Sequence, residues 1–195
     1  RFEACKLIKD EKLNNFVVEM HIEAPLVAKK AKPGQFIILR VDEEGERIPL
    51  TISGYDRENG TVRIIFQIVG GTTKALSMKN EGEYISDFCG PLGEATKTEN
   101  LKKVLIVGGG VGCAIALPVA QKLHADGAEV VSVIGFRNKD LLILEDEFKA
   151  VSDRLFVMTD GGSAGEKGNV CAPLKKMFSD GESFDAVVAI GPLVL

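Results

Sequence analysis

The stretch that decides the fold is Val104-Leu105-Ile106-Val107-Gly108-Gly109-Gly110-Val111-Gly112. Four apolar residues predict a buried strand, and a helical pattern from Val111 to Ala125 follows the glycines. Glycines let the backbone turn tightly and approach a pyrophosphate, and a helix start offers free N–H groups. We therefore expect a phosphate-binding loop; the alternative is a strand-to-helix turn that holds no ligand. The residues expected to contact the phosphates are Gly108, Gly110, Val111 and Gly112.

Strand and helix patterns alternate through the rest of this half of the chain. Further strands are expected at residues 130–134, 155–158 and 186–190, and helices at 144–150 and 171–178. This order implies a parallel sheet of the Rossmann-like, nucleotide-binding kind. We expect the domain to cover residues 99–195, after a polar linker at Gly93–Asn100.

Residues 1–98 carry a β pattern instead. Short runs rich in Val, Ile and Phe are separated by turn signals such as Pro33-Gly34 and Asn59-Gly60, the latter typical of a tight hairpin. One short helix is expected from Thr72 to Met78. These features predict a small antiparallel β-barrel, so the fold class is a β-barrel followed by an α/β domain. The expected strands are Lys6–Lys9, Phe16–Ile22, Gln35–Val41, Arg47–Ser53, Thr61–Val69 and Glu83–Cys89.

Composition excludes several classes of protein. Of 195 residues, 45% are hydrophobic and 27% are charged, which is typical of globular domains rather than disordered chains. The net charge of −4 argues against nucleic acid as a partner. Four scattered cysteines without a CxxC pair argue against a zinc site or a disulfide scaffold. Because neither a signal peptide nor a membrane-spanning apolar run is evident, we expect a cytoplasmic protein with no membrane partner.

Two further motifs are weaker on their own. Arg47–Ser53 places a cation at the start of a strand and hydroxyls along it, which is also common in strands without a ligand. Val69–Leu76 is a strand end, a Gly-Gly turn and a threonine at a helix start. This second motif is equally compatible with a cradle for a diphosphate and with a simple helix cap.

The order of these motifs is more specific than any one of them. The chain resembles the ferredoxin–NADP reductase superfamily in the order of its motifs. A barrel with an Arg-bearing strand comes first, followed by Gly70–Lys74, Gly90–Gly93 and a dinucleotide fold. The chain is most similar to the electron-transfer-subunit branch, which includes the electron-transfer subunit of dihydroorotate dehydrogenase B and the small subunit of NADH-dependent ferredoxin:NADP oxidoreductase, also called sulfide dehydrogenase. Further matching stretches are Ala24-Pro25, Pro33–Phe36, Gly108–Ala114, Gly135–Asp140, Leu141–Phe148, Thr159–Gly168 and Gly191-Pro192.

The resemblance implies that the barrel binds FAD. Arg47 would pair with the diphosphate and Thr51 would lie near flavin N5, with Leu50 in the position of an aromatic residue in many relatives. The widespread motif is Arg-x-Tyr-Ser/Thr, and aligning it on Thr51 puts Ile48, not Arg47, at the arginine position. The branch with Pro before Leu or Ile tolerates this shift. The expected FAD-binding set is Arg47, Pro49, Leu50, Thr51, Ile68, Val69, Gly71, Thr72 and Thr73.

The resemblance also implies that the second domain binds NAD(P)H. Gly108–Gly112 would meet the pyrophosphate, and Asp160 would lie near the cofactor after a strand end. Arg137 stands where many NAD-binding folds have an acid that binds the ribose, so it favours NADP, whereas the branch favours NADH. Cys113 is expected to be a small apolar residue rather than a catalytic thiol.

The resemblance implies the activity of an FAD-dependent NAD(P)H oxidoreductase. Hydride would move to FAD in a cleft between the domains. Electrons would then leave through a [2Fe–2S] cluster to a larger catalytic subunit. No acid–base residue is needed, because the flavin does the chemistry. Four closely spaced cysteines for the cluster are missing here, so a longer chain is expected to carry it, and no metal site is expected in these residues. The alternatives are a free-standing ferredoxin- or flavodoxin-dependent NADP reductase and a non-catalytic nucleotide-binding regulatory subunit.

Overall fold

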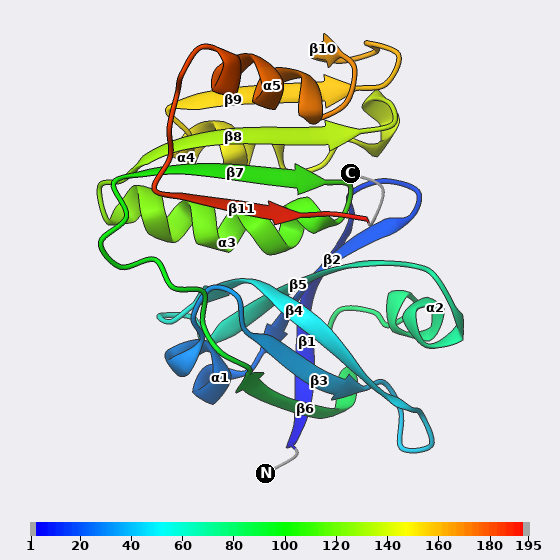
Figure 1. The fold of residues 1–195 in the computed structure, drawn as a ribbon. Helices are drawn as coiled ribbons and strands as arrows, with labels where there is room; N and C mark the ends of the chain where they lie inside the picture. Colours follow the sequence, from blue (N-terminus) through cyan, green and yellow to red (C-terminus); the bar gives the residue numbers. More distant parts are fainter. Residues whose placement is uncertain (1–2, 193–195) are drawn as a thin grey trace. The chain divides into compact units, whose positions relative to one another are not determined.

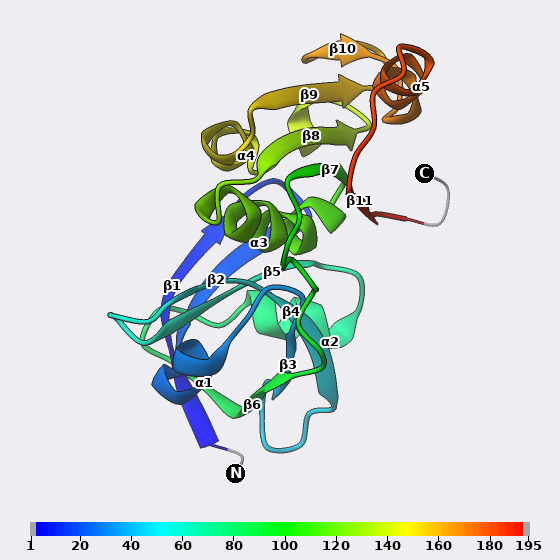
Figure 2. The same ribbon diagram turned by 60° about the vertical axis from the view of Figure 1, so that its left-hand side comes forward.

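A computed structural model describes residues 3–192. The chain divides into two compact units, Arg1–Thr96 and Lys97–Leu195. Both units are drawn in Figures 1 and 2. Over the described residues, no helix is long and apolar enough to cross a membrane.

The first unit is a closed antiparallel barrel with the strand order β1-β2-β5-β4-β3-β6 (Figure 1), which confirms the expected barrel. Inward-facing side chains alternate along the strands, as Val18, Met20 and Ile22 show, and they form one apolar core. The elements are β1 (Glu3–Lys12), β2 (Val17–Glu23), α1 (Pro25–Lys30), β3 (Phe36–Arg40), β4 (Arg47–Asp56), β5 (Thr61–Gln67), α2 (Gly71–Ser77) and β6 (Tyr84–Leu92).

The sequence patterns missed α1 and misjudged one turn. Pro25 opens α1 at its first position, and Val27 and Ala28 bury the inner side of this six-residue helix, which is too short to show a clear period. The expected β4–β5 hairpin is present, but positive φ at both Asn59 and Gly60 is not. The connection spans residues 57–60, and only Gly60 has a positive φ (+66°), because the Asp56 carboxylate accepts the backbone N–H groups of Glu58 and Asn59.

The second unit is a parallel sheet with the strand order β10-β9-β8-β7-β11, which confirms the expected α/β fold. Its α5 packs on one face of the sheet against residues such as Leu105 and Val133, while α3 and α4 contact each other and neighbouring strands (Figure 2). The elements are β7 (Lys103–Gly109), α3 (Gly112–Ala125), β8 (Glu129–Phe136), the 3-10 turn η1 (Lys139–Leu141), α4 (Glu145–Val151), β9 (Arg154–Thr159), β10 (Glu166–Lys167), α5 (Cys171–Ser179) and β11 (Ala186–Ile190).

The topology of this sheet predicts where a ligand binds. From β7 the chain proceeds outward through β8 and β9, and then β11 returns to the other side of β7. Ligands of open α/β sheets bind beyond the carboxyl ends of the strands, where the order reverses. That point lies beside β7, at the start of α3.

Candidate functional site

The glycine loop between β7 and α3 is packed too closely for side chains at two positions. A Cβ on Gly108 would lie 2.8 Å from Cys113 Sγ, and one on Gly112 would lie 2.5 Å from the carbonyl oxygen of Ile190 at the end of β11. Gly110 is different, because its φ is +54° and a Cβ there would meet no protein atom within 4 Å. The loop therefore presents an open surface at Gly110.

The loop also offers backbone donors. The Gly110 N–H donates to the Gly135 carbonyl at 3.0 Å, and the N–H groups of Cys113 and Ala114 donate back to Gly110 and Val111. Within residues 3–192, the N–H groups of Val111 and Gly112 have no hydrogen-bond partner. Two free amides at the start of the 14-residue α3 suit an anionic group.

Arg137 and Asp160 lie at the same edge of the sheet as this loop. The register pairs Gly109 with Gly135 and Phe136 with Thr159, so the loops after β7, β8 and β9 begin side by side. Buried Thr159 fixes the loop after β9: its Oγ1 donates to the Ala164 carbonyl at 2.7 Å. Both Arg137 and Asp160 are exposed, and the structure brings all the residues expected to bind the nucleotide to one edge.

In the barrel, β4 separates the expected FAD-binding residues onto two faces. Ile52 lies in the barrel core, and Ile48 and Leu50 pack against that core. Side chains alternate along a strand, so Arg47, Pro49 and Thr51 share the outer face. Of Arg47 and Ile48, only Arg47 lies on the face of Thr51, and Leu50 is not brought onto that face.

Arg47 belongs to a cluster that the sequence patterns did not predict. The register places Arg40 opposite both Arg47 and Asp87, on three neighbouring strands. Asp87 Oδ2 lies 2.7 Å from Arg40 Nε and 3.0 Å from Arg47 Nη2, which offsets the repulsion between the two cations. The Arg47 side chain stays half-exposed (49%), so its guanidinium is held in place and still reaches solvent.

The turn before α2 is built around Thr73. Its Oγ1 accepts the N–H groups of Val69 and Gly70 at 2.9 and 3.1 Å, while Thr72 Oγ1 donates to the Glu46 carboxylate. The Ile68 N–H donates to the Phe16 carbonyl at 2.8 Å. A Cβ on Gly70 or Gly71 would meet no protein atom within 4 Å, so the turn has open space in front of it.

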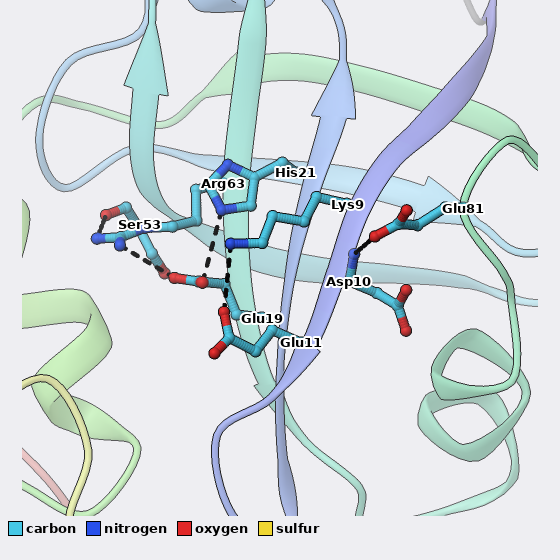
Figure 3. Close-up of polar contacts among 8 residues, drawn as sticks. All are labelled: Lys9, Asp10, Glu11, Glu19, His21, Ser53, Arg63 and Glu81. Carbon is cyan, nitrogen blue, oxygen red and sulfur yellow. Dashed lines mark hydrogen bonds and ion pairs between the residues drawn. The ribbon is translucent and has the colours of Figure 1, made fainter.

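A third set of polar residues lies on β2, β4 and β5 (Figure 3). Arg63 Nη1 lies 3.0 Å from Glu19 Oε1, and Arg63 Nη2 donates to the Ser53 carbonyl at 3.1 Å. His21 lies 3.6 Å from Glu19; its hydrogen bond, together with the charge of Arg63, lowers the pKa of that carboxyl although burial opposes the shift. Ser53 ends the Arg47–Ser53 motif, whereas no sequence pattern indicated Glu19, His21 or Arg63.

Two of the four cysteines, Cys5 and Cys113, are not placed as reactive groups. Cys113 is fully buried, and burial raises the pKa of its thiol to about 12. Burial and nearby carboxylates raise the pKa of Cys5 to about 11. Both thiols therefore stay protonated at neutral pH, which agrees with a packing role for Cys113.

The donor set fits FAD and a nicotinamide dinucleotide. The barrel offers a guanidinium, the Thr51 hydroxyl and open space before the Gly70–Gly71 turn. The second unit offers two free amides beside an open glycine. These are the groups that diphosphates and flavin ring acceptors need.

Comparisons with known proteins point the same way, although no family model matches the chain. It is 45% identical to a protein of Thermotoga maritima named as a homolog of the electron transfer subunit of dihydroorotate dehydrogenase B (NAD(+)), covering 97% of this chain and 67% of that protein. The subunit of that name from Streptococcus pneumoniae is 37% identical, over 98% of this chain and 74% of the relative. The chain thus spans about two-thirds to three-quarters of these relatives.

Solved structures indicate the same relatives as the sequence comparison. A chain of the NADH-dependent reduced ferredoxin-NADP oxidoreductase, studied for flavin-based electron bifurcation, has a TM-score of 0.90 at 44% identity, covering 97% of this chain and 68% of its own. Phthalate dioxygenase reductase has a TM-score of 0.72 at 16% identity and shows likeness of fold alone. The relatives confirm the resemblance seen in the motifs: the chain belongs to the electron-transfer-subunit branch of the ferredoxin–NADP reductase superfamily, with the electron transfer subunit of dihydroorotate dehydrogenase B.

Proposed function

We propose that the chain is a flavoprotein electron-transfer subunit that binds FAD on its barrel, binds NADH at its glycine loop and delivers electrons to a larger partner subunit. The observation that supports the proposal is the presence in one chain of two surfaces whose donors suit anionic groups. One is the outer face of β4 with the Gly70–Thr73 turn, and the other is the pair of free amides at the start of α3. The partner is proposed from the relatives, which are named as subunits.

Each group has a definite task in this proposal. Arg47, held by Asp87, binds the FAD diphosphate, and the Gly70–Thr73 turn lets the diphosphate approach the backbone. Thr51 orients the ring by a hydrogen bond. The amides of Val111 and Gly112 bind the pyrophosphate of the dinucleotide. When bound, FAD accepts the hydride and releases electrons, so the protein needs to supply binding and orientation rather than an acid or base.

The first test is the identity of the flavin. The full chain should be purified yellow, and heat denaturation should release FAD, identified by chromatography. The barrel with an anchored arginine beside an open turn supports FAD, because FMN lacks the diphosphate that this surface fits. Release of FMN alone, or the absence of any flavin from well-folded protein, would reject the proposal and favour a nucleotide-binding regulatory subunit.

The second test concerns the choice between NADH and NADPH. We expect NADH to reduce the flavin faster than NADPH, and Arg137→Ala to change the NADH rate less than about twofold. A charge-assisted contact from Arg137 to a 2′-phosphate would contribute about 1.5–3 kcal/mol, or roughly tenfold or more in preference. Stopped-flow reduction with each nucleotide measures this. Faster reduction by NADPH that is lost in Arg137→Ala would overturn the NADH assignment and favour an NADP reductase.

A further inference from the structure

We infer that Arg40 is a positioning residue for FAD, which acts through Asp87 and the β3–β4 loop to hold the Arg47 guanidinium ready for the diphosphate. Neither Arg40 nor Asp87 contacts the ligand itself. The inference rests on the proposed function, because it takes the anion that Arg47 binds to be the diphosphate of FAD. It deepens that proposal by adding a support that no ligand-binding motif of the sequence contains.

The three charged side chains form one row across the neighbouring strands β6, β3 and β4 (Figure 1). The register places Arg40 opposite Asp87 on one side and opposite Arg47 on the other. Side-chain exposure rises along the row, from 12% for Asp87 to 23% for Arg40 and 49% for Arg47. Arg47 is therefore the member that a ligand can reach, whereas the other two are largely covered.

The Asp87 carboxylate lets two arginines face each other. Its Oδ2 lies 2.7 Å from Arg40 Nε and 3.0 Å from Arg47 Nη2. The contact to Arg47 is a hydrogen bond, whereas Arg40 Nε makes no aligned hydrogen bond within residues 3–192, so Arg40 acts on the carboxylate by its charge. Like charges directly opposite each other on neighbouring strands repel. The shared carboxylate offsets this repulsion and gives Arg47 a fixed partner.

Arg40 also holds the loop that leads to Arg47. Its Nη1 donates to the Glu43 carbonyl, and the Gly45 N–H donates to the Asp42 carbonyl at 3.0 Å. Strand β3 ends at Arg40 and β4 begins at Arg47, so the loop of residues 41–46 determines where Arg47 begins its strand. Arg40 thus constrains Arg47 in two ways, through the Asp87 side chain and through the backbone.

A guanidinium that is already held binds an anion more tightly than a mobile one, because it has less rotamer freedom to lose. For a fully mobile arginine, that freedom corresponds to about 30-fold in an equilibrium constant. Because Arg47 is half-exposed, it keeps some of this freedom. We therefore expect Arg40 and Asp87 to contribute about 3- to 10-fold to the affinity for FAD.

Arg40→Lys tests the inference, because it keeps the charge of the row but replaces a guanidinium with two contacts by a single ammonium. The affinity for FAD, measured by fluorescence titration of the flavin-free full chain, should fall about 3- to 10-fold. In the Arg47→Ala background the same substitution should change the affinity less than about twofold, because no guanidinium is left to hold. A residue that bound the diphosphate directly, or only stabilised the fold, would weaken binding in both backgrounds.

Asp87→Asn separates position from charge. Removing an anion near a diphosphate should, by charge alone, tighten FAD binding. We expect the variant to bind FAD about 3- to 10-fold more weakly instead, because Arg40 would then repel Arg47. In the Arg47→Ala background only the effect of charge remains, so there Asp87→Asn should tighten binding by up to about twofold.

Arg57→Lys is the matched control. Arg57 lies just beyond the other end of β4, where its guanidinium donates to the carbonyls of Lys29 and Ala31, each at 3.0 Å. This variant also loses a guanidinium with two contacts in the barrel unit, so it should unfold more easily than the parent. Its affinity for FAD should stay within about twofold of the parent.

The outcomes separate this inference from the proposed function. If the parent binds FAD but Arg40→Lys and Asp87→Asn keep or raise its affinity, the inference is overturned and the proposed function stands. Equal losses with and without Arg47, or an equal loss in Arg57→Lys, would also overturn it, because the effect would then be on the fold. If the parent binds no FAD, both fail together.

Discussion

Replacing Gly110 by valine is expected to abolish reduction of the flavin by NADH while FAD stays bound. The Cβ at this position would enter open space in front of the loop, so the two methyl groups would occupy the volume that a pyrophosphate needs. The FAD surface is on the barrel, in the other unit. Stopped-flow measurement of flavin reduction, with the flavin content measured on the same sample, distinguishes loss of nucleotide binding from loss of FAD.

The control for this prediction is Gly127→Val. Gly127 also has a positive φ (+84°) and open space at its Cβ position, but it lies between α3 and β8, at the opposite edge of the parallel sheet. Both variants should lose stability by about 1–3 kcal/mol from strained backbone. Only Gly110→Val should lose reduction by NADH. Equal rates of flavin reduction by NADH in the two variants would show that the glycine loop does not bind the nucleotide.

Thr73→Asp is expected to weaken FAD binding about tenfold. Its carboxylate can still accept the N–H groups of Val69 and Gly70, so the turn should survive, but it places an anion beside the diphosphate. Two charges about 5 Å apart repel by about 3 kcal/mol at an effective dielectric of about 20. Because Thr73 is partly exposed, we discount this to about 1.4 kcal/mol, a tenfold rise in the dissociation constant.

Thr73→Asn isolates the charge. Asparagine has nearly the same shape as aspartate and can accept the same two N–H groups, but it is neutral. We expect its FAD affinity to stay within about threefold of the parent, measured by fluorescence titration of the flavin-free chain. If the asparagine variant were weakened as much as the aspartate variant, the cause would be the turn itself rather than repulsion of a diphosphate.

The parts of the fold that the sequence predicted are those encoded locally. Val104–Gly112 carries a buried strand, a glycine turn and a helix start within nine consecutive residues, so its pattern needed no knowledge of the rest of the chain. The helix at Pro25–Lys30 and the two-residue strand at Glu166–Lys167 were missed, because neither is long enough to show a period.

The candidate site was predictable only in part, because strand register decides which side chains meet. Asp87 supports Arg47 from 40 residues away, and nothing in either local sequence indicates the pairing. The same holds for Glu19 and Arg63, which are 44 residues apart. Register also shows that Arg47 rather than Ile48 shares the face of Thr51, because that face is known only once Ile52 is placed in the core.

The most direct test of the central claim is anaerobic mixing of the FAD-loaded chain with NADH. We expect the absorbance band of oxidised flavin to disappear with one equivalent of NADH, since this chain is proposed to bind both the hydride donor and its acceptor. A flavin that remains oxidised in excess NADH, in protein that holds FAD and is correctly folded, would contradict it.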